Sequence, residues 1–224
     1  MSESFFSRVK EKLSARSAEA DAITIPGEIK APQILDSRES NGYLTGQLLI
    51  ATPVITGTCF QKSVIYVFSH NDEGAMGIIV NQPLEVVNFS TLLESAKLPE
   101  TMRQAKMPVY FGGPVDRSRG FVVHSTEQVN DLTLMHKNGV GITTSSTILQ
   151  EIAAGRGPRH AILGVGYAGW TAGQLEAEIA ENSWLTVPAT PELVFRTDDE
   201  LKWATAGKSL GITMELYSTA IGHA

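Results

Sequence analysis

Seven residues of this sequence combine a group that can bind a ligand with a position at, or just beyond, the end of a predicted strand. Their imidazole, amide, hydroxyl and indole groups can hydrogen-bond or stack, and two consecutive glycines leave backbone N–H groups uncovered. Ligand sites often form at such places because a rigid scaffold holds the loops. We expect any ligand pocket to be lined by this group: His70, Asn81, Gly112, Gly113, His124, Thr144 and Trp170.

Two segments of this group also have a purely structural interpretation. Turn chemistry favours a tight connection between two strands at the Gly-Gly-Pro segment 112–114, where the proline removes one donor. In the hydroxyl-rich run 143–147, Thr147 and Gln150 have the spacing of a helix capping box. The alternative for both segments is a small anion bound by backbone N–H groups and hydroxyls.

The segment 160–179 has the outline of a dinucleotide-binding fingerprint. A predicted strand is followed by G-x-G-x-x-G at 164–169 and then by a predicted helix. A pyrophosphate would have to lie on the N-terminus of that helix, but Thr171 and Gln174 are spaced to cap the same N–H groups. We therefore predict no nucleotide cofactor. The glycines should instead allow close packing of the strand, the helix and Trp170.

Other catalytic chemistry finds little support in the sequence. A zinc site needs several converging His, Cys or carboxylate ligands, and neither the five histidines nor the single cysteine show such a spacing. No G-x-S-x-G segment presents a serine nucleophile. Cys59 has uncharged neighbours, which predicts a buried structural cysteine. We predict no metal and no cofactor, and we favour a protein that is not an enzyme.

The charge balance argues against direct binding to nucleic acid. With 18 basic and 24 acidic residues the chain has a formal charge of −6, whereas nucleic-acid binding depends on neutralising phosphates. Two short basic clusters, 117–119 and 156–159, fit solvated loops. The C-terminal residues resemble a helix-turn-helix, but the predicted recognition helix from Thr213 onward has no Lys, Arg, Asn or Gln to read base edges.

The elements that must position these residues indicate one α+β domain. Residues 1–43 form a polar, turn-rich N-terminal extension, partly disordered or with a short amphipathic helix at its start. In the domain at 44–224, strands come early and helices late, which favours a mixed, largely antiparallel sheet with a hairpin turn at 70–74. Strands are predicted over 46–53, 63–70, 74–83, 108–113, 120–125, 140–146, 159–166 and 183–189, and helices over 89–97, 147–155, 171–182, 191–195 and 198–210.

Several blocks of the sequence resemble the YqgE/AlgH family. They are GQLLIATP, SVIYVFSHNDEGAMGIIVNQP, YFGGPVDRSRGFVVHS, GYAGWTAGQLEAEI with NSWL after it, and the closing LGI and GHA. The resemblance covers residues 44–224 and implies a coiled, bifurcated sheet packed with helices. It implies little about function, because the family has no established reaction and one branch is labelled a transcriptional regulator.

These observations favour a soluble cytoplasmic protein that works as a regulatory or interaction module through a protein partner. No apolar run is long enough to span a bilayer, so we expect no membrane insertion. Through the family resemblance we expect any effect on transcription to be indirect. The alternative is a sensor or enzyme for a small anionic ligand, bound at the glycine turns and helix starts. A direct DNA-binding regulator is the least favoured class.

Overall fold

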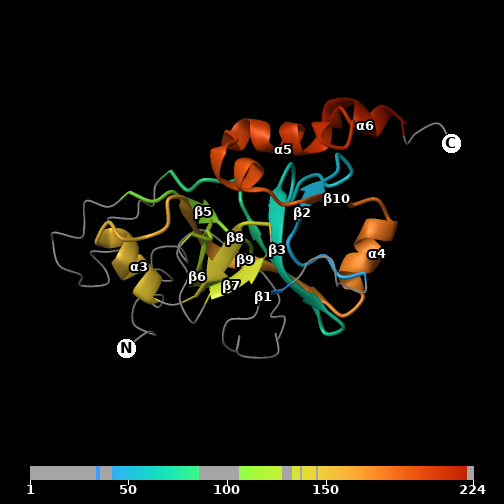
Figure 1. Ribbon diagram of the computed structural model, residues 1–224. Coiled ribbons are helices and arrows are strands. Elements are labelled where there is room, and N and C mark those ends of the chain that lie inside the picture. Colours follow the sequence, from blue (N-terminus) through green and yellow to red (C-terminus); the bar gives the residue numbers. More distant parts are fainter. Residues whose placement is uncertain are drawn as a thin grey trace.

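Ten strands form one sheet in the part of the chain that the computed structural model describes, namely residues 34–35, 42–85, 106–127, 133–136, 138–144 and 146–220 (Figure 1). Nine of them follow the order β1-β7-β8-β6-β9-β4-β3-β2-β10, and β5 pairs with β9 beside this path. The strands are β1 (Ile34–Leu35), β2 (Gln47–Ala51), β3 (Val64–Asn71), β4 (Gly74–Ile79), β5 (Val109–Phe111), β6 (Val115–Ser125), β7 (Thr133–His136), β8 (Val140–Thr143), β9 (Ala161–Thr171) and β10 (Trp184–Pro188).

The sheet is mixed and largely antiparallel, which confirms the predicted α+β class. β3 and β4 form the predicted hairpin, with Asn71 opposite Gly74. Within the described ranges only β1–β7 and β5–β9 are parallel pairs. The sheet divides along β9, where β5 pairs with residues 163–165 and β4 with residues 168–171. This division is the predicted bifurcation.

In the described part of the chain, five helical segments cover the sheet and give it two buried faces. Alternate residues of β2 and β3 point to opposite faces, so that Leu48 and Tyr66 enter one hydrophobic cluster while Leu49 and Ile65 enter another. The first face packs against the C-terminal helices, and the other is covered by α3 at one end and α4 at the other (Figure 1). The segments are α3 (Ser146–Ala153), α4 (Gln174–Ala180), the π-helix η3 (Glu192–Arg196), α5 (Asp199–Lys208) and α6 (Met214–Ala220).

The end of α3 follows from local sequence. Gly155 has a φ of +73°, and its N–H donates to Ile152 O at 3.0 Å. The next N–H, of Arg156, donates to Glu151 O at 2.9 Å. These two bonds form a Schellman motif, which needs a left-handed residue at the glycine position. The predicted stop at Gly155 is therefore confirmed.

The predicted start of α4 is wrong. β9 continues through the whole glycine motif to Thr171, because β4 pairs with its last residues and satisfies their backbone groups. The N-cap of α4 is accordingly Gly173, in a left-handed conformation, instead of Thr171. Only half of the predicted capping box forms: Gln174 Oε1 accepts the Thr171 N–H at 3.0 Å.

Other differences concern element ends and one loop. α3 begins at Ser146, so Thr147 lies inside its first turn and is not the N-cap. Cys59 is exposed, not buried, because it belongs to a surface loop; desolvation of its thiol raises the pKa, and the charge of Arg117 offsets only part of this effect. The predicted helices at the chain start and at 89–97 lie outside the described residues, and within the extension β1 pairs with β7.

Candidate functional site

The seven predicted site residues lie in three separate places along the sheet. Each place has its own set of contacts, and none of the seven is among the residues that line the pocket described below. Their predicted role in ligand binding stays a prediction. The three groups are His70 with Trp170, Asn81 with Gly112 and Gly113, and His124 with Thr144.

Both ring nitrogens of His70 are engaged within the fold. Nδ1 accepts the Leu44 N–H at 3.0 Å, so the ring proton is on Nε2, which donates to Glu176 Oε1 at 3.0 Å. The Tyr43 ring packs edge-on against the imidazole, with ring centroids 5.1 Å apart. These contacts fasten the start of the domain to β3 and α4 and occupy the lone pair that a substrate or metal would need.

His124 is completely buried in the sheet. Nδ1 donates to Ser125 O at 3.0 Å, so Nε2 is the acceptor for the Thr143 hydroxyl at 2.9 Å. Burial lowers the pKa of His124, and the hydrogen bond to Ser125 and the charge of Glu127 offset only part of that effect. The imidazole is therefore neutral at pH 7, with both nitrogens used. Thr144 follows β8 directly and is half-buried.

Gly112 and Gly113 lie where the chain crosses β9. β5 and β6 pair with opposite edges of β9, so these flanking strands do not form a hairpin with each other. A Cβ on Gly112 would lie 2.3 Å from Gly166 O, and one on Gly113 would lie 2.1 Å from the Tyr167 carbonyl carbon. Gly166 has a φ of +74°, and its own Cβ would lie 2.4 Å from Gly113 O. The double glycine and the middle glycine of G-x-G-x-x-G are thus two sides of one contact, the backbone crossing.

Polar groups beside the backbone crossing are used by the sheet. The Gly112 N–H donates to Val165 O at 2.9 Å, and Gly112 O accepts the Ile79 N–H at 2.9 Å. The Asn81 amide closes the adjacent loop, because Oδ1 accepts the Val64 N–H at 2.8 Å and Nδ2 donates to Lys62 O at 2.9 Å. The glycines do allow close packing, but Gly164 and Gly166 face neighbouring strands, not α4 or Trp170 as predicted.

Trp170 is 7% exposed and shares a hydrophobic cluster with Leu175 of α4. Its Nε1–H donates to Glu178 Oε2 at 2.8 Å, and the Trp184 Nε1–H donates to the same oxygen at 2.7 Å. The two indole rings meet edge to face with centroids 6.0 Å apart. One carboxylate and two tryptophans therefore clamp α4 to β9 and β10.

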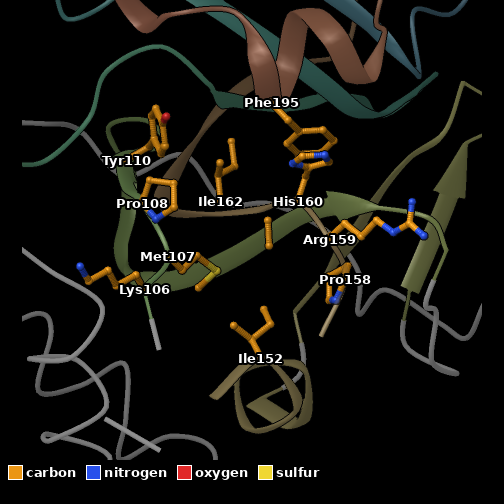
Figure 2. A pocket seen from close by; sticks show the side chains of 11 residues that line it. Lys106, Met107, Pro108, Tyr110, Ile152, Pro158, Arg159, His160, Ile162 and Phe195 are labelled. Carbon is orange, nitrogen blue, oxygen red and sulfur yellow. The ribbon is translucent and has the colours of Figure 1, made fainter. Parts of the chain in front are cut away.

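A pocket of about 270 Å³ opens between the residues that lead into β5 and β9. Ile152 of α3 and Phe195 of η3 face it from opposite sides, and the Met107 side chain reaches toward its middle (Figure 2). The His160 imidazole stacks on Phe195 with planes 15° apart and centroids 5.9 Å apart. The exposed Lys106 and Arg159 extend outward at opposite ends (Figure 2). We take this pocket, whose lining is part polar and part apolar and whose rim is basic, as the candidate site.

A small polar network holds the β9 wall of the pocket. The Ser125 hydroxyl accepts the His160 N–H at 3.1 Å and donates to Glu127 Oε1 at 2.9 Å. Glu127 also accepts the Arg159 backbone N–H at 2.5 Å. Desolvation raises the pKa of Glu127, but these hydrogen bonds and the Arg159 charge outweigh it and hold the pKa below its ordinary value. Glu127 is therefore ionised at neutral pH and fixes the backbone that carries Arg159 and His160.

A buried lysine holds the η3 wall. The Lys202 ammonium donates to Val80 O at 2.5 Å, Val194 O at 3.1 Å and Asp199 Oδ1 at 2.9 Å, which uses all three N–H groups. Burial lowers the pKa of Lys202, and Asp199 offsets part of this effect. Asp199 also accepts the Tyr110 hydroxyl at 3.0 Å; burial, followed by this carboxylate, raises the pKa of Tyr110. The network joins η3 and α5 to β5 and to Val80, which directly follows β4, and so places Phe195.

The chemistry available at the pocket is binding by charge and apolar contact. Lys106 and Arg159 supply positive charge at the rim, and the ring nitrogens of His160 make no hydrogen bond within the described part of the chain. Among the described residues no group of three or more His, Cys, Asp or Glu could hold a metal ion. In the same residues, none of the helices has both the length and the apolar character needed to span a bilayer.

No local motif predicts the residues of this pocket, because they come from distant segments. Lys106 and Met107 precede a short strand, and Phe195 belongs to a late helical turn. One local sign was available: an arginine and a histidine stand side by side at 159–160, directly before a strand. Arg159 was predicted to be a solvated loop residue, and its side chain is exposed.

Comparisons with known proteins find relatives along most of the chain. A family model described as AlgH-like matches residues 48–215. A UPF0301 protein of Methylobacterium nodulans is 45% identical over 211 residues, 90% of this chain and 95% of its own length, and one of Nitrobacter hamburgensis is 50% identical over 192 residues, 81% and 88%. The solution structure of the AlgH protein from Pseudomonas aeruginosa has a TM-score of 0.67 at 39% identity and covers 83% of this chain and 98% of that one. The crystal structure of DIP2367 from Corynebacterium diphtheriae, with a TM-score of 0.63 at 22% identity over 80% of this chain and 94% of its own, shares the fold.

Proposed function

The chain belongs to the AlgH-like family, and from this premise we propose that it is a regulatory module that binds a small anion and has no catalysis of its own. In this proposal the module works in the cytoplasm and acts through a protein partner. Any effect on transcription is then indirect.

The observation that carries the proposal is the basic rim of the pocket. The chain as a whole has a formal charge of −6, yet Lys106 and Arg159 both border the same pocket. Positive side chains that line the same cleft attract anions locally, whatever the net charge of the chain. His160 adds a ring that can donate or accept a hydrogen bond at the edge of the recess.

Three buried titratable side chains, His70, His124 and Lys202, are not available as catalysts. A general base needs a free lone pair within reach of its substrate. The lone pairs and protons of His70 and His124 are used by Leu44, Glu176, Ser125 and Thr143, as described above. Lys202 likewise donates all three of its N–H groups to protein oxygens. These groups stabilise the fold.

The C-terminal helices support an indirect effect on transcription. α5 and α6 are joined through Gly211, whose φ is +73°, and they pack closely at Gly207, where a Cβ would lie 2.2 Å from Met214 Cγ. This gives the unit the outline of a helix-turn-helix. However, the only charged residue of α6 is Glu215, which would repel a phosphate.

Native mass spectrometry of the freshly purified full chain, combined with thermal shifts across a panel of small anionic metabolites, tests the proposal. We expect either a co-purified mass or a saturable stabilisation of about 2.7 kcal/mol at 100-fold excess over Kd. The Arg159→Gln variant should show neither the co-purified mass nor the stabilisation.

Two results would contradict the proposal. A clean mass of the chain alone, together with no thermal shift for any anion, would exclude the ligand. A turnover above about 1 s⁻¹ in a general enzyme screen, the low end of ordinary enzymes, would show that the protein is itself a catalyst.

A further inference from the structure

The size of the pocket restricts the ligand. Its volume is about 270 Å³, whereas a cavity of about 150 Å³ already holds benzene and drug-sized ligands occupy about 300–1,000 Å³. One ring with a small substituent fits this volume. A nucleotide, with its base, sugar and phosphates, is too large to be enclosed.

The walls of the pocket favour a flat ring. Phe195 and His160 already form a near-parallel stack, and rings add to such stacks in offset geometry. The Met107 thioether reaches toward the middle of the pocket, and sulfur makes favourable contacts with aromatic rings (Figure 2). Ile152 and Ile162 are among the remaining apolar lining residues. A ring bound here has an aromatic face on one side and a polarisable sulfur nearby.

The rim favours one anionic group on that ring. Arg159 has a planar guanidinium that suits a carboxylate or a phosphate. Glu127, the neighbouring carboxylate, takes the Arg159 backbone N–H, and in the described residues no hydrogen bond or ion pair joins it to the guanidinium. Lys106 lies at the opposite end of the pocket from Arg159 (Figure 2). A ligand with a single ring and one anionic group therefore pairs with one of these two cations and not with both.

From these observations we infer that the pocket takes a small aromatic anion: one flat ring that extends the Phe195–His160 stack and carries one carboxylate or phosphate paired with Arg159. This inference rests on the proposed function and specifies its ligand. The ring and the charge make separable contributions, which the choice of probes can isolate.

NMR titration of the full chain with four probes tests the inference. Benzoate and phenyl phosphate carry both features, inorganic phosphate carries only the charge, and benzyl alcohol carries only the ring. We expect saturable binding of benzoate or phenyl phosphate with a Kd of about 1 mM, as suits ligands with so few heavy atoms. The stronger of the two identifies the anionic group. Inorganic phosphate and benzyl alcohol should each bind at least about fivefold more weakly.

Two variants and a matched control complete the test. Phe195→Leu should weaken the better probe by about threefold to tenfold, and Arg159→Gln by about fivefold or more. Arg196→Gln removes the same charge from η3, outside the pocket lining, and should leave binding unchanged. If inorganic phosphate binds as tightly as the ring-bearing probes, the ring is wrong while the proposed anion site stands. The inference is overturned if benzyl alcohol binds as tightly as the anionic ring probes, or if no probe binds. It is also overturned if Arg196→Gln weakens binding more than Arg159→Gln does.

Discussion

The backbone crossing at Gly112, Gly113 and Gly166 and the basic-rimmed pocket both lie along β9, but they differ in every other respect. The crossing has the more conspicuous sequence, because a double glycine and a G-x-G-x-x-G motif are both typical of ligand-binding loops. In the structure these glycines contact each other, and an added Cβ on any of them would clash with the facing backbone. The pocket is formed by residues of unremarkable pattern from distant segments. Glycine motifs can therefore report close packing of backbones, while a binding surface can have no motif.

The strongest test of this comparison is a methyl group at the crossing. Gly166→Ala places a Cβ 2.4 Å from Gly113 O and requires a φ of +74°, so we expect a loss of about 4 kcal/mol or more, or no folded protein. The matched control is Gly155→Ala, where φ is +73° but nothing lies within 4 Å, and where the cost should be about 1 kcal/mol. Urea denaturation measures both; equal losses would contradict the packing role of Gly166.

Removing the contacts that Trp170 makes with α4 and Trp184 should cause the next largest loss of stability. Trp170→Ala removes a buried indole and should destabilise the protein by about 3–5 kcal/mol. Trp170→Phe should recover most of the packing and lose about 1 kcal/mol with the hydrogen bond to Glu178. Thermal melts of the two variants measure these losses of stability. A loss below about 1 kcal/mol for the alanine variant would return Trp170 to the predicted ligand-binding residues.

The burial of His124 in β6 should make the stability of the protein sensitive to acid. Burial holds the pKa of His124 below its ordinary value of 6.5, so in acid the unfolded chain binds a proton that the folded chain does not. This stability contribution is complete above about pH 6.5 and is lost as the pH falls toward the folded-state pKa. We expect His124→Gln to reduce the pH dependence of the unfolding free energy between pH 6.5 and 5 by up to about 1.4 kcal/mol per pH unit. An unchanged slope would contradict this role.

The rim of the pocket should be the least important for stability. Arg159→Gln changes an exposed side chain whose backbone, not its guanidinium, is bound by Glu127. Its effect on the free energy of unfolding should stay within about 0.5 kcal/mol, the range of ordinary surface substitutions. Chemical denaturation of this variant beside Gly166→Ala sharpens the contrast. A loss above about 1 kcal/mol would make Arg159 a structural residue and weaken the argument for a binding site.

Local features of the fold were predictable from the sequence. Runs of apolar residues rich in β-branched and aromatic side chains placed β2, β3 and β4, and the turn at 70–74 placed the hairpin between the last two. The left-handed glycine at 155 ended α3. Each of these features depends on residues within a few positions of one another, so propensity and turn chemistry suffice to find it.

The sequence by itself determined the class of the sheet and the regions of most of its strands, because these follow from local residue preferences and turn residues. Only the tertiary structure decided what the glycines do: pairing with β4 extended β9 through the motif, and the crossing brought Gly113 onto Gly166. The pocket likewise depends on long-range contacts, since Lys202 must reach Val80 and Val194 before Phe195 can meet His160. Such contacts join residues far apart in the chain, and no local pattern specifies them.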